Sequence, residues 1–123
     1  MTVNRKRLGA LGEAEASRRL ALQGYEILET NWRSRLGELD LIAREGGRLV
    51  FIEVRARSAG SVGRFGTAAE SVDARKQNKL RSVAAAYLTM TRQRDAFVRF
   101  DVIAVTIGED DRIEAYTHYE AAF

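Results

Sequence analysis

Residues 37–58 read GELDLIAREGGRLVFIEVRARS, and this stretch decides the fold. Residues 36–44 and 48–57 have the alternating or continuous apolar pattern that is typical of strands. Glu45-Gly46-Gly47 between them is a hairpin signal. We therefore expect two antiparallel strands joined by a tight turn.

The segments on either side of this hairpin complete an α/β pattern. Helical spacing, turn residues and apolar runs predict a helix over 5–23 that ends at Gly24, a strand over 25–30, a helix over 73–90 with Asp73 as its N-cap, and strands over 97–107 and 112–118. The predicted strand over 97–107 is almost wholly apolar, which indicates a central strand covered on both faces. The order α-β-β-β-α-β-β favours a single α/β domain over residues 1–123, with a mixed central β-sheet flanked by helices.

The composition excludes several classes of protein. The 123 residues include no cysteine, which excludes a disulfide framework, a thiolate metal site and a cysteine nucleophile. The single histidine, His118, excludes multi-histidine metal clusters and argues against a Ser-His-Asp triad. No apolar run approaches the ~18 residues of a membrane span, and the basic start of the chain lacks the apolar core of a signal peptide. We expect a cytoplasmic protein with no membrane partner.

Charge is distributed unevenly along the chain. The whole sequence carries +3, but residues 1–94 carry a net +8 and residues 95–123 a net −5. Seventeen of the twenty basic residues are arginine, whose planar guanidinium suits phosphate and carboxylate groups. A basic body favours a polyanionic partner such as nucleic acid, although arginine-rich usage also follows from genome composition.

Acidic residues on the hairpin form a candidate site. By the two-residue period of a strand, Glu38, Asp40 and Ile42 share one face, while Glu53 lies inside an apolar run of the second strand. Burying a carboxylate is costly unless it is paired, and two adjacent carboxylates are relieved by a bound cation or a raised pKa. Such a pair makes an oxygen-ligand site for Mg²⁺ or Mn²⁺, an ion that can activate water and neutralise phosphoryl charge.

A cation follows the second acid on the same face of its strand. Arg55 lies two residues after Glu53, where it can stabilise negative charge that develops on a scissile phosphate. The alternative is a structural ion-pair network in which Arg55 or Arg57 neutralises the two acids. The residues alone leave both interpretations open.

These residues resemble a known signature. The pattern Asp40 … Glu53-Val54-Arg55 looks like the PD-(D/E)XK nuclease signature, and the expected element order resembles the core of that superfamily. The chain more closely resembles the YraN-like family of bacterial proteins, often described as predicted endonucleases. The pieces that carry this resemblance run along nearly the whole chain: Gly24-Tyr25, Asn31-Trp32-Arg33, GELDLIARE at 37–45, LVFIEVRARS at 49–58, Phe65-Gly66, Lys76-Gln77 and Arg99-Phe100-Asp101-Val102. More distantly, the arrangement is similar to that of archaeal Holliday junction resolvases.

The resemblance implies a restriction-endonuclease-like fold with a Mg²⁺ or Mn²⁺ cofactor. It implies that Glu13, on an apolar stripe of the first helix, joins Asp40 and Glu53 as a metal ligand. Arg55 stands where the superfamily has lysine; arginine keeps the positive charge but effectively cannot act as a base. The residues expected to contact nucleic acid are Lys76 or Gln77 on the second helix, Arg64 in the glycine-rich loop 58–67, and Arg57.

We therefore predict a metal-dependent endonuclease that hydrolyses phosphodiester bonds, with Asp40, Glu53 and Arg55 as its catalytic residues. DNA is the expected nucleic acid, and branched DNA is a candidate substrate. One alternative is a nucleic-acid-binding or assembly module that keeps the fold without turnover, and another is a metal-dependent hydrolase of small phosphate esters. Junction-cutting relatives act as two-fold dimers, so a homodimer is a further expectation, although no residue identifies an interface.

Four other residues are expected to have structural roles. Trp32 is predicted at the core or its rim. Glu38 is expected to bond Arg35 or a helix N-terminus in preference to a metal ion. Asp101 is expected to be structural, and His118 is expected at the surface.

Overall fold

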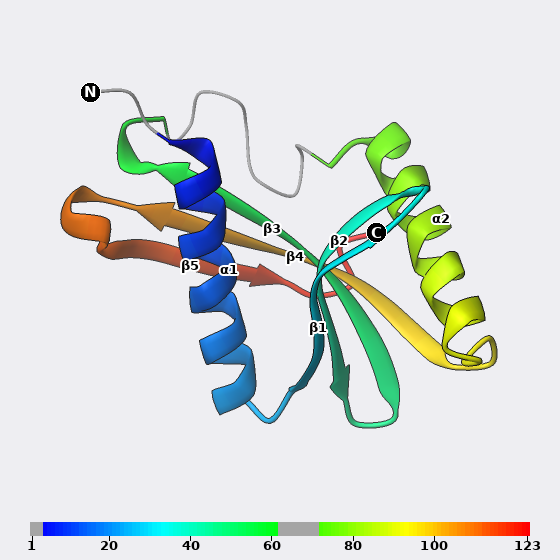
Figure 1. The fold of residues 1–123 in the computed structure, drawn as a ribbon. Coiled ribbons are helices and arrows are strands. Elements are labelled where there is room, and N and C mark those ends of the chain that lie inside the picture. Colours follow the sequence, from blue (N-terminus) through cyan, green and yellow to red (C-terminus); the bar gives the residue numbers. More distant parts are fainter. Residues whose placement is uncertain (1–3, 62–71) are drawn as a thin grey trace.

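A computed structural model describes residues 4–61 and 72–123 as an α/β fold (Figure 1). The elements follow the order α1 (Arg5–Leu22), β1 (Glu26–Ser34), β2 (Gly37–Glu45), β3 (Arg48–Ser58), α2 (Ala74–Met90), β4 (Phe97–Ile107) and β5 (Ile113–Tyr119), with single 3-10 turns at Ala59–Ser61 and Glu109–Asp111. This confirms the predicted order α-β-β-β-α-β-β. Arg64 and most of the predicted loop 58–67 lie outside the described residues.

The five strands form one mixed sheet in the order β1-β2-β3-β4-β5. β3 pairs parallel to β4, and the other neighbouring strands pair antiparallel. Alternate residues of β3 enter two separate apolar clusters, Val50 and Ile52 with α1, and Leu49 and Phe51 with α2. The two helices therefore cover opposite faces of the sheet, as Figure 1 shows, and the architecture is consistent with a restriction-endonuclease-like fold.

α1 lies unusually close to the sheet because it presents a glycine to it. A Cβ built on Gly12 would lie 2.8 Å from the Cβ of Ala56 on β3, which is closer than real Cβ contacts. Ala16 and Leu20 continue the buried side of the helix. The helix ends where predicted: Gly24 adopts φ +95°, the left-handed conformation that favours glycine after a helix.

α2 begins at the predicted cap and packs on the other face. The Asp73 side chain accepts a hydrogen bond from the Lys76 amide at 2.9 Å. Four side chains of α2 are buried, Leu80, Val83, Ala84 and Tyr87. The Trp32 ring meets Tyr87 edge to face at 5.2 Å and packs, partly buried, against the core, so the prediction that Trp32 lies at the core or its rim is confirmed.

β1 is longer than the sequence predicted. The predicted strand stopped at residue 30, but β1 continues to Ser34, which pairs with Gly37 across a two-residue turn. Apart from Trp32, the second half of β1 is polar, as an edge strand allows, and three of its last five residues are exposed. Asn31 also interrupts the strand with φ +52°, and this irregularity hides the strand's alternation.

The prediction that His118 lies at the surface is wrong. Its side chain is 13% exposed, and Nε2 lies 2.7 Å from Oδ2 of the fully buried Asp101. Arg99 donates to Asp101 from Nε at 2.9 Å and to the Tyr25 hydroxyl at 2.7 Å. A buried polar network therefore ties β4 and β5 to the segment after α1. Neither of the two described helices is long and apolar enough to cross a membrane.

Candidate active site

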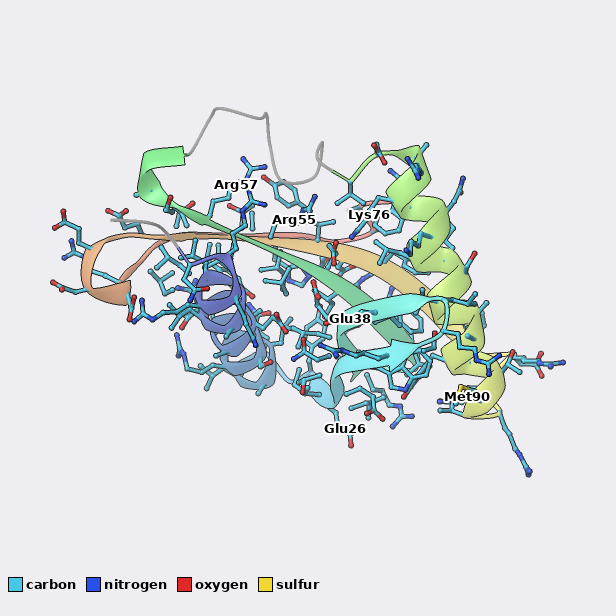
Figure 2. All side chains as sticks on the ribbon, turned by 45° about the horizontal axis from the view of Figure 1, so that its top comes forward. Glu26, Glu38, Arg55, Arg57, Lys76 and Met90 are labelled. Atoms are coloured by element: carbon cyan, nitrogen blue, oxygen red, sulfur yellow. The ribbon has the colours of Figure 1, made fainter. Side chains whose placement is uncertain are left out.

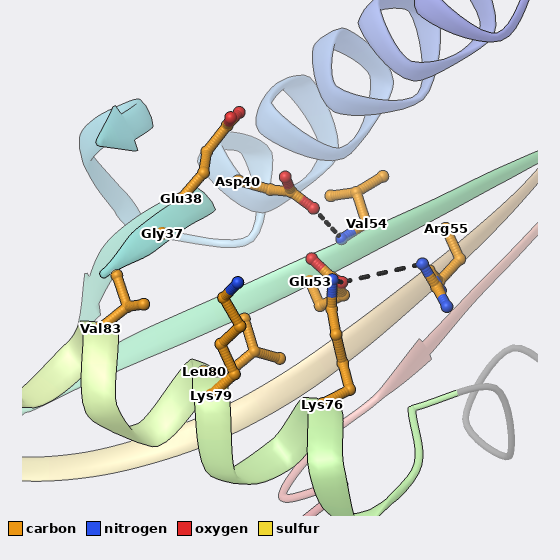
Figure 3. Close-up of a pocket in the computed structure, with 10 residues that line it drawn as sticks. All are labelled: Gly37, Glu38, Asp40, Glu53, Val54, Arg55, Lys76, Lys79, Leu80 and Val83. Atoms are coloured by element: carbon orange, nitrogen blue, oxygen red, sulfur yellow. Dashed lines mark hydrogen bonds and ion pairs between the residues drawn. The ribbon is translucent and has the colours of Figure 1, made fainter. Parts of the chain in front are cut away.

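The candidate site forms where β2 and β3 stop pairing. Their ladder runs from Glu45–Arg48 to Leu41–Ile52 and ends there. The next residues along the two strands are Asp40 and Glu53. Oδ2 of Asp40 accepts a hydrogen bond from the Val54 amide at 2.8 Å (Figure 3), so a side chain satisfies a backbone donor beyond the end of the ladder.

β2 does not keep a regular alternation through Asp40. Leu39 and Ile42 both enter the apolar cluster on the α2 side, whereas Leu41 enters the cluster on the α1 side. On β1, Asn31 would oppose Asp40 in the same register, and neither pairs with the other. The prediction that Glu38, Asp40 and Ile42 share a face is therefore wrong, because the β1–β2 hairpin is irregular at this level.

The two carboxylates open into a pocket of about 380 Å³ between β2, β3 and the first half of α2 (Figure 3). We call it the carboxylate pocket. Glu53 is only 7% exposed, and two cations contact its Oε2. Lys76 Nζ lies 3.2 Å away and Arg55 Nη1 lies 3.8 Å away. The buried acid is thus paired from its own strand and from α2.

Burial and neighbouring negative charges raise the pKa of two acids at the site, Asp40 and Glu13. Burial, together with the hydrogen bond and the repulsion from Glu53, raises the pKa of Asp40 to about 8, although the Val54 amide opposes the shift. Burial also raises the pKa of Glu13 above its usual value, against a hydrogen bond from Asn31, and the charges of Glu38 and Glu53 add to the rise. The negative groups therefore form an electrostatic cluster at the point where β1, β2, β3 and α1 meet.

The raised pKa of Asp40 predicts a pH dependence of stability. An aspartate in the unfolded chain has a pKa near 3.9, so between about pH 4 and pH 8 folding takes up a proton and the free energy of unfolding falls as pH rises. Asp40→Asn removes this group. In the presence of a metal chelator, the stability advantage of the variant over the wild type should grow by at least about 1 kcal/mol between pH 5 and pH 9. Urea denaturation at both pH values measures the difference, and parallel stability curves would contradict the shift.

Two of the three predicted metal ligands, Asp40 and Glu53, lie next to each other in the structure. The third, Glu13, is hydrogen-bonded to Asn31. Among residues 4–61 and 72–123, no three acidic or histidine side chains converge closely enough to form a metal-binding group. Yet Oε1 of Glu13 is buried with no hydrogen-bond partner in this part of the chain, so it has an unused acceptor.

The predicted nucleic-acid contacts lie in different places. Lys76 lines the carboxylate pocket, whereas Gln77 does not and donates to the Val72 carbonyl at 2.9 Å. Arg57 follows Arg55 along β3 toward the far end of that strand (Figure 2). Arg64 belongs to the segment that the structure does not describe.

Two lining residues add to the predicted set. Lys79 lines the pocket one helical turn after Lys76, and the spacing of three residues on a helix could have indicated that both lie on one face. Glu38 also lines it, and its carboxylate lies 3.3 Å from Arg33, in place of the predicted Arg35.

The fold and the site together define an α/β protein with a five-stranded mixed sheet, two flanking helices and a cation-lined carboxylate pair where two central strands part. The chain belongs to the UPF0102 family: the model described as "Uncharacterised protein family UPF0102" matches residues 12–105. A UPF0102 protein of Moorella thermoacetica is 46% identical over 123 residues, all of both chains. Another, of Pelotomaculum thermopropionicum, is 44% identical over 97% of both chains, and one of Frankia alni is 50% identical over 80% of both.

Proposed function

We propose that this protein is a Mg²⁺- or Mn²⁺-dependent nuclease of the PD-(D/E)XK type that hydrolyses phosphodiester bonds of nucleic acid. The observation that carries the proposal is the meeting of Asp40 and Glu53 in an open pocket beside Lys76 and Arg55. Burying Glu53 beside Asp40, whose pKa is raised, is costly for folding, and raised pKa values of this kind concentrate at functional sites.

The donor set fits a hard divalent cation. Carboxylate oxygens are the ligands that Mg²⁺ and Mn²⁺ prefer, and Oε1 of Glu13, which has no hydrogen-bond partner among the described residues, is a third oxygen at the edge of the cluster. Asp40 and Glu53 would hold the ion, and Glu13 would join them by exchanging its hydrogen bond to Asn31 for the ion. Such an ion neutralises charge on a phosphoryl group and activates water.

The two cations have different chemical capacities. Arg55 stays protonated, so it can stabilise negative charge but cannot exchange a proton. Lys76 places its ammonium 3.2 Å from Glu53, and a lysine ammonium binds phosphate as a point charge. We assign Arg55 to charge stabilisation and Lys76 to phosphate binding.

The direct test is cleavage by the purified chain. Linear, nicked, flapped and four-way DNA, together with single-stranded RNA, would be incubated with Mg²⁺ and with Mn²⁺. Metal-dependent products that disappear with Asp40→Asn support the proposal. Products that persist with Asp40→Asn would come from a contaminant.

A second candidate is a non-catalytic nucleic-acid-binding module. The observation that favours it is the double ion pair at Glu53, because Lys76 and Arg55 already neutralise this carboxylate without a metal ion. In this case the acids hold β3 and α2 together and need no divalent cation.

Metal-dependent stabilisation separates the two candidates. Millimolar Mn²⁺ should raise the melting temperature of the wild type, because a ligand of the folded state stabilises it by mass action. At a concentration one hundred times the dissociation constant the gain is about 2.7 kcal/mol. Glu53→Gln should lose this gain. Equal responses of wild type and variant in differential scanning calorimetry would favour the binding module.

A further inference from the structure

The turn between β1 and β2 presents an exposed leucine beside the carboxylate pocket. The last pair of the ladder is Ser34–Gly37, so the turn itself consists of Arg35 and Leu36. We call these two residues the apex. The Leu36 residue is 53% exposed, and Gly37, which follows it, lines the pocket. The apex therefore stands at the rim of the candidate active site.

The apex is held in place by its own turn and by α2. The Leu36 amide donates to Oγ of Ser34 at 3.1 Å. A Cβ built on Gly37, whose φ is +149°, would lie 3.1 Å from both Lys79 Cε and Val83 Cγ2. Figure 1 shows the end of the hairpin resting beside α2. These contacts with Ser34 and α2 fix the turn, so the exposed Leu36 side chain is held in a defined position.

Three cations and one carboxylate lie around the apex, so its surroundings carry net positive charge. The Arg33 side chain is 77% exposed, with the Glu38 carboxylate 3.3 Å away. Arg35 and Lys79 are exposed as well. If the apex approached a base step of a nucleic acid, the phosphate groups on either side of that step could form ionic contacts with these cations. A single apolar side chain between cations suits a nucleic acid better than an apolar protein surface.

We propose that Leu36 is a wedge that enters an unstacked base step, with Arg33 and Arg35 on the flanking phosphates. This inference rests on the proposed function and specifies its substrate class: duplex nucleic acid interrupted by a nick, flap or branch. Proteins that insert leucine between bases must first unstack them, which costs a few kcal/mol per step. An interrupted duplex has already lost part of that stacking, so the wedge selects it over continuous duplex.

The geometry also predicts where cleavage falls. Asp40 lies four residues after Leu36 in the chain, which is about 13 Å along an extended strand. One strand of a duplex advances about 3.4 Å per nucleotide. The scissile bond should therefore lie within about four nucleotides of the interruption.

The test measures metal-free binding to one duplex in nicked and continuous form. A 2-aminopurine base at the nick reports unstacking. Wild-type protein should bind the nicked duplex on the order of tenfold more tightly than the continuous one, with a rise in fluorescence. Leu36→Ala should lose both effects. Leu22→Ala is the matched control, because Leu22 is 76% exposed at the end of α1, and it should behave as wild type.

Two results would contradict the wedge role of Leu36 without contradicting the proposed nuclease activity. One is an equal nicked-to-continuous affinity ratio in Leu36→Ala and Leu22→Ala. The other is a wild-type dimer that Leu36→Ala converts to a monomer in sedimentation, because the apex would then bind a second copy. Cleavage of single-stranded DNA in the presence of Mn²⁺ tests the nuclease activity independently of the wedge. If the wild type neither binds nor cleaves any nucleic acid, both proposals fail.

Discussion

Glu53→Gln is expected to lower the metal-dependent cleavage rate on the order of 10³-fold. The amide keeps the shape of the side chain but removes the charge that faces Lys76 and Arg55 at 3.2 and 3.8 Å. It also removes one of the two charged oxygen donors proposed for the metal ion. Loss of one electrostatic stabiliser in a water-poor site costs about 10²–10³ in rate, and here the same change also weakens the metal site. Initial rates on the best DNA substrate at saturating Mn²⁺ measure the effect.

A matched substitution elsewhere controls for the loss of a glutamate. Glu26→Gln removes an exposed carboxylate on β1 whose nearest cation is Arg44 at 3.4 Å, and its rate should stay within about twofold of wild type, because exposed ion pairs contribute little. Circular dichroism of Glu53→Gln confirms that the variant is folded. Unchanged cleavage by the folded variant would remove Glu53 from the mechanism and leave it as a structural ion-pair partner.

Asp101→Ala should lower the free energy of unfolding by about 3–5 kcal/mol, which is more than any other substitution proposed for this protein. The carboxylate is fully buried and accepts hydrogen bonds from Arg99 Nη2 at 2.8 Å and the Ala121 amide at 3.0 Å, with His118 Nε2 at 2.7 Å. Burial alone would raise the pKa of Asp101, but the bonds to His118 and Arg99 outweigh it and the pKa lies below its usual value. Removing the carboxylate leaves the Arg99 charge, 10% exposed, without its main partner.

Thermal unfolding measures this loss, expected as a drop of roughly 10–20 °C in Tm. Asp111→Ala provides the comparison, because Asp111 pairs with Arg7 at the surface, where their side chains are 36% and 60% exposed. Such a pair contributes about 0–1 kcal/mol. A small and equal loss in both variants would mean that the buried network does not hold β4 and β5 in place.

Local patterns were sufficient to predict the order of elements. Gly46 and Gly47 form the predicted hairpin turn, and Asp73 caps α2 as expected. Each depends on a few residues that are close together in the chain. The second half of β1 could not be predicted in this way, because Asn31 adopts a positive φ there and the strand lies at a polar edge.

The candidate site was predicted from the pairing of two neighbouring strands, but the β2–β3 pairing ends just before Asp40 and Glu53. The sequence placed Asp40 and Glu53 on neighbouring strands, and the structure confirms that they adjoin. It did not indicate that the ladder ends beside them, because the sequence pattern predicted a regular alternation through Asp40 that β2 does not keep. Nor could it show the contact of Lys76 with Glu53, since a helix–strand contact across 23 residues leaves no periodic signal. The burial of His118 likewise depends on a distant partner, Asp101.

The close approach of α1 to the sheet makes two positions depend on each other. Gly12 immediately precedes Glu13, and the space that its missing side chain leaves is filled by the methyl group of Ala56, 2.8 Å from where a Cβ would stand. Volume added at either position would push the helix away from β3 and would carry Glu13 with it. The position of the Glu13 carboxylate is therefore a joint property of two small residues, neither of which has a polar side chain.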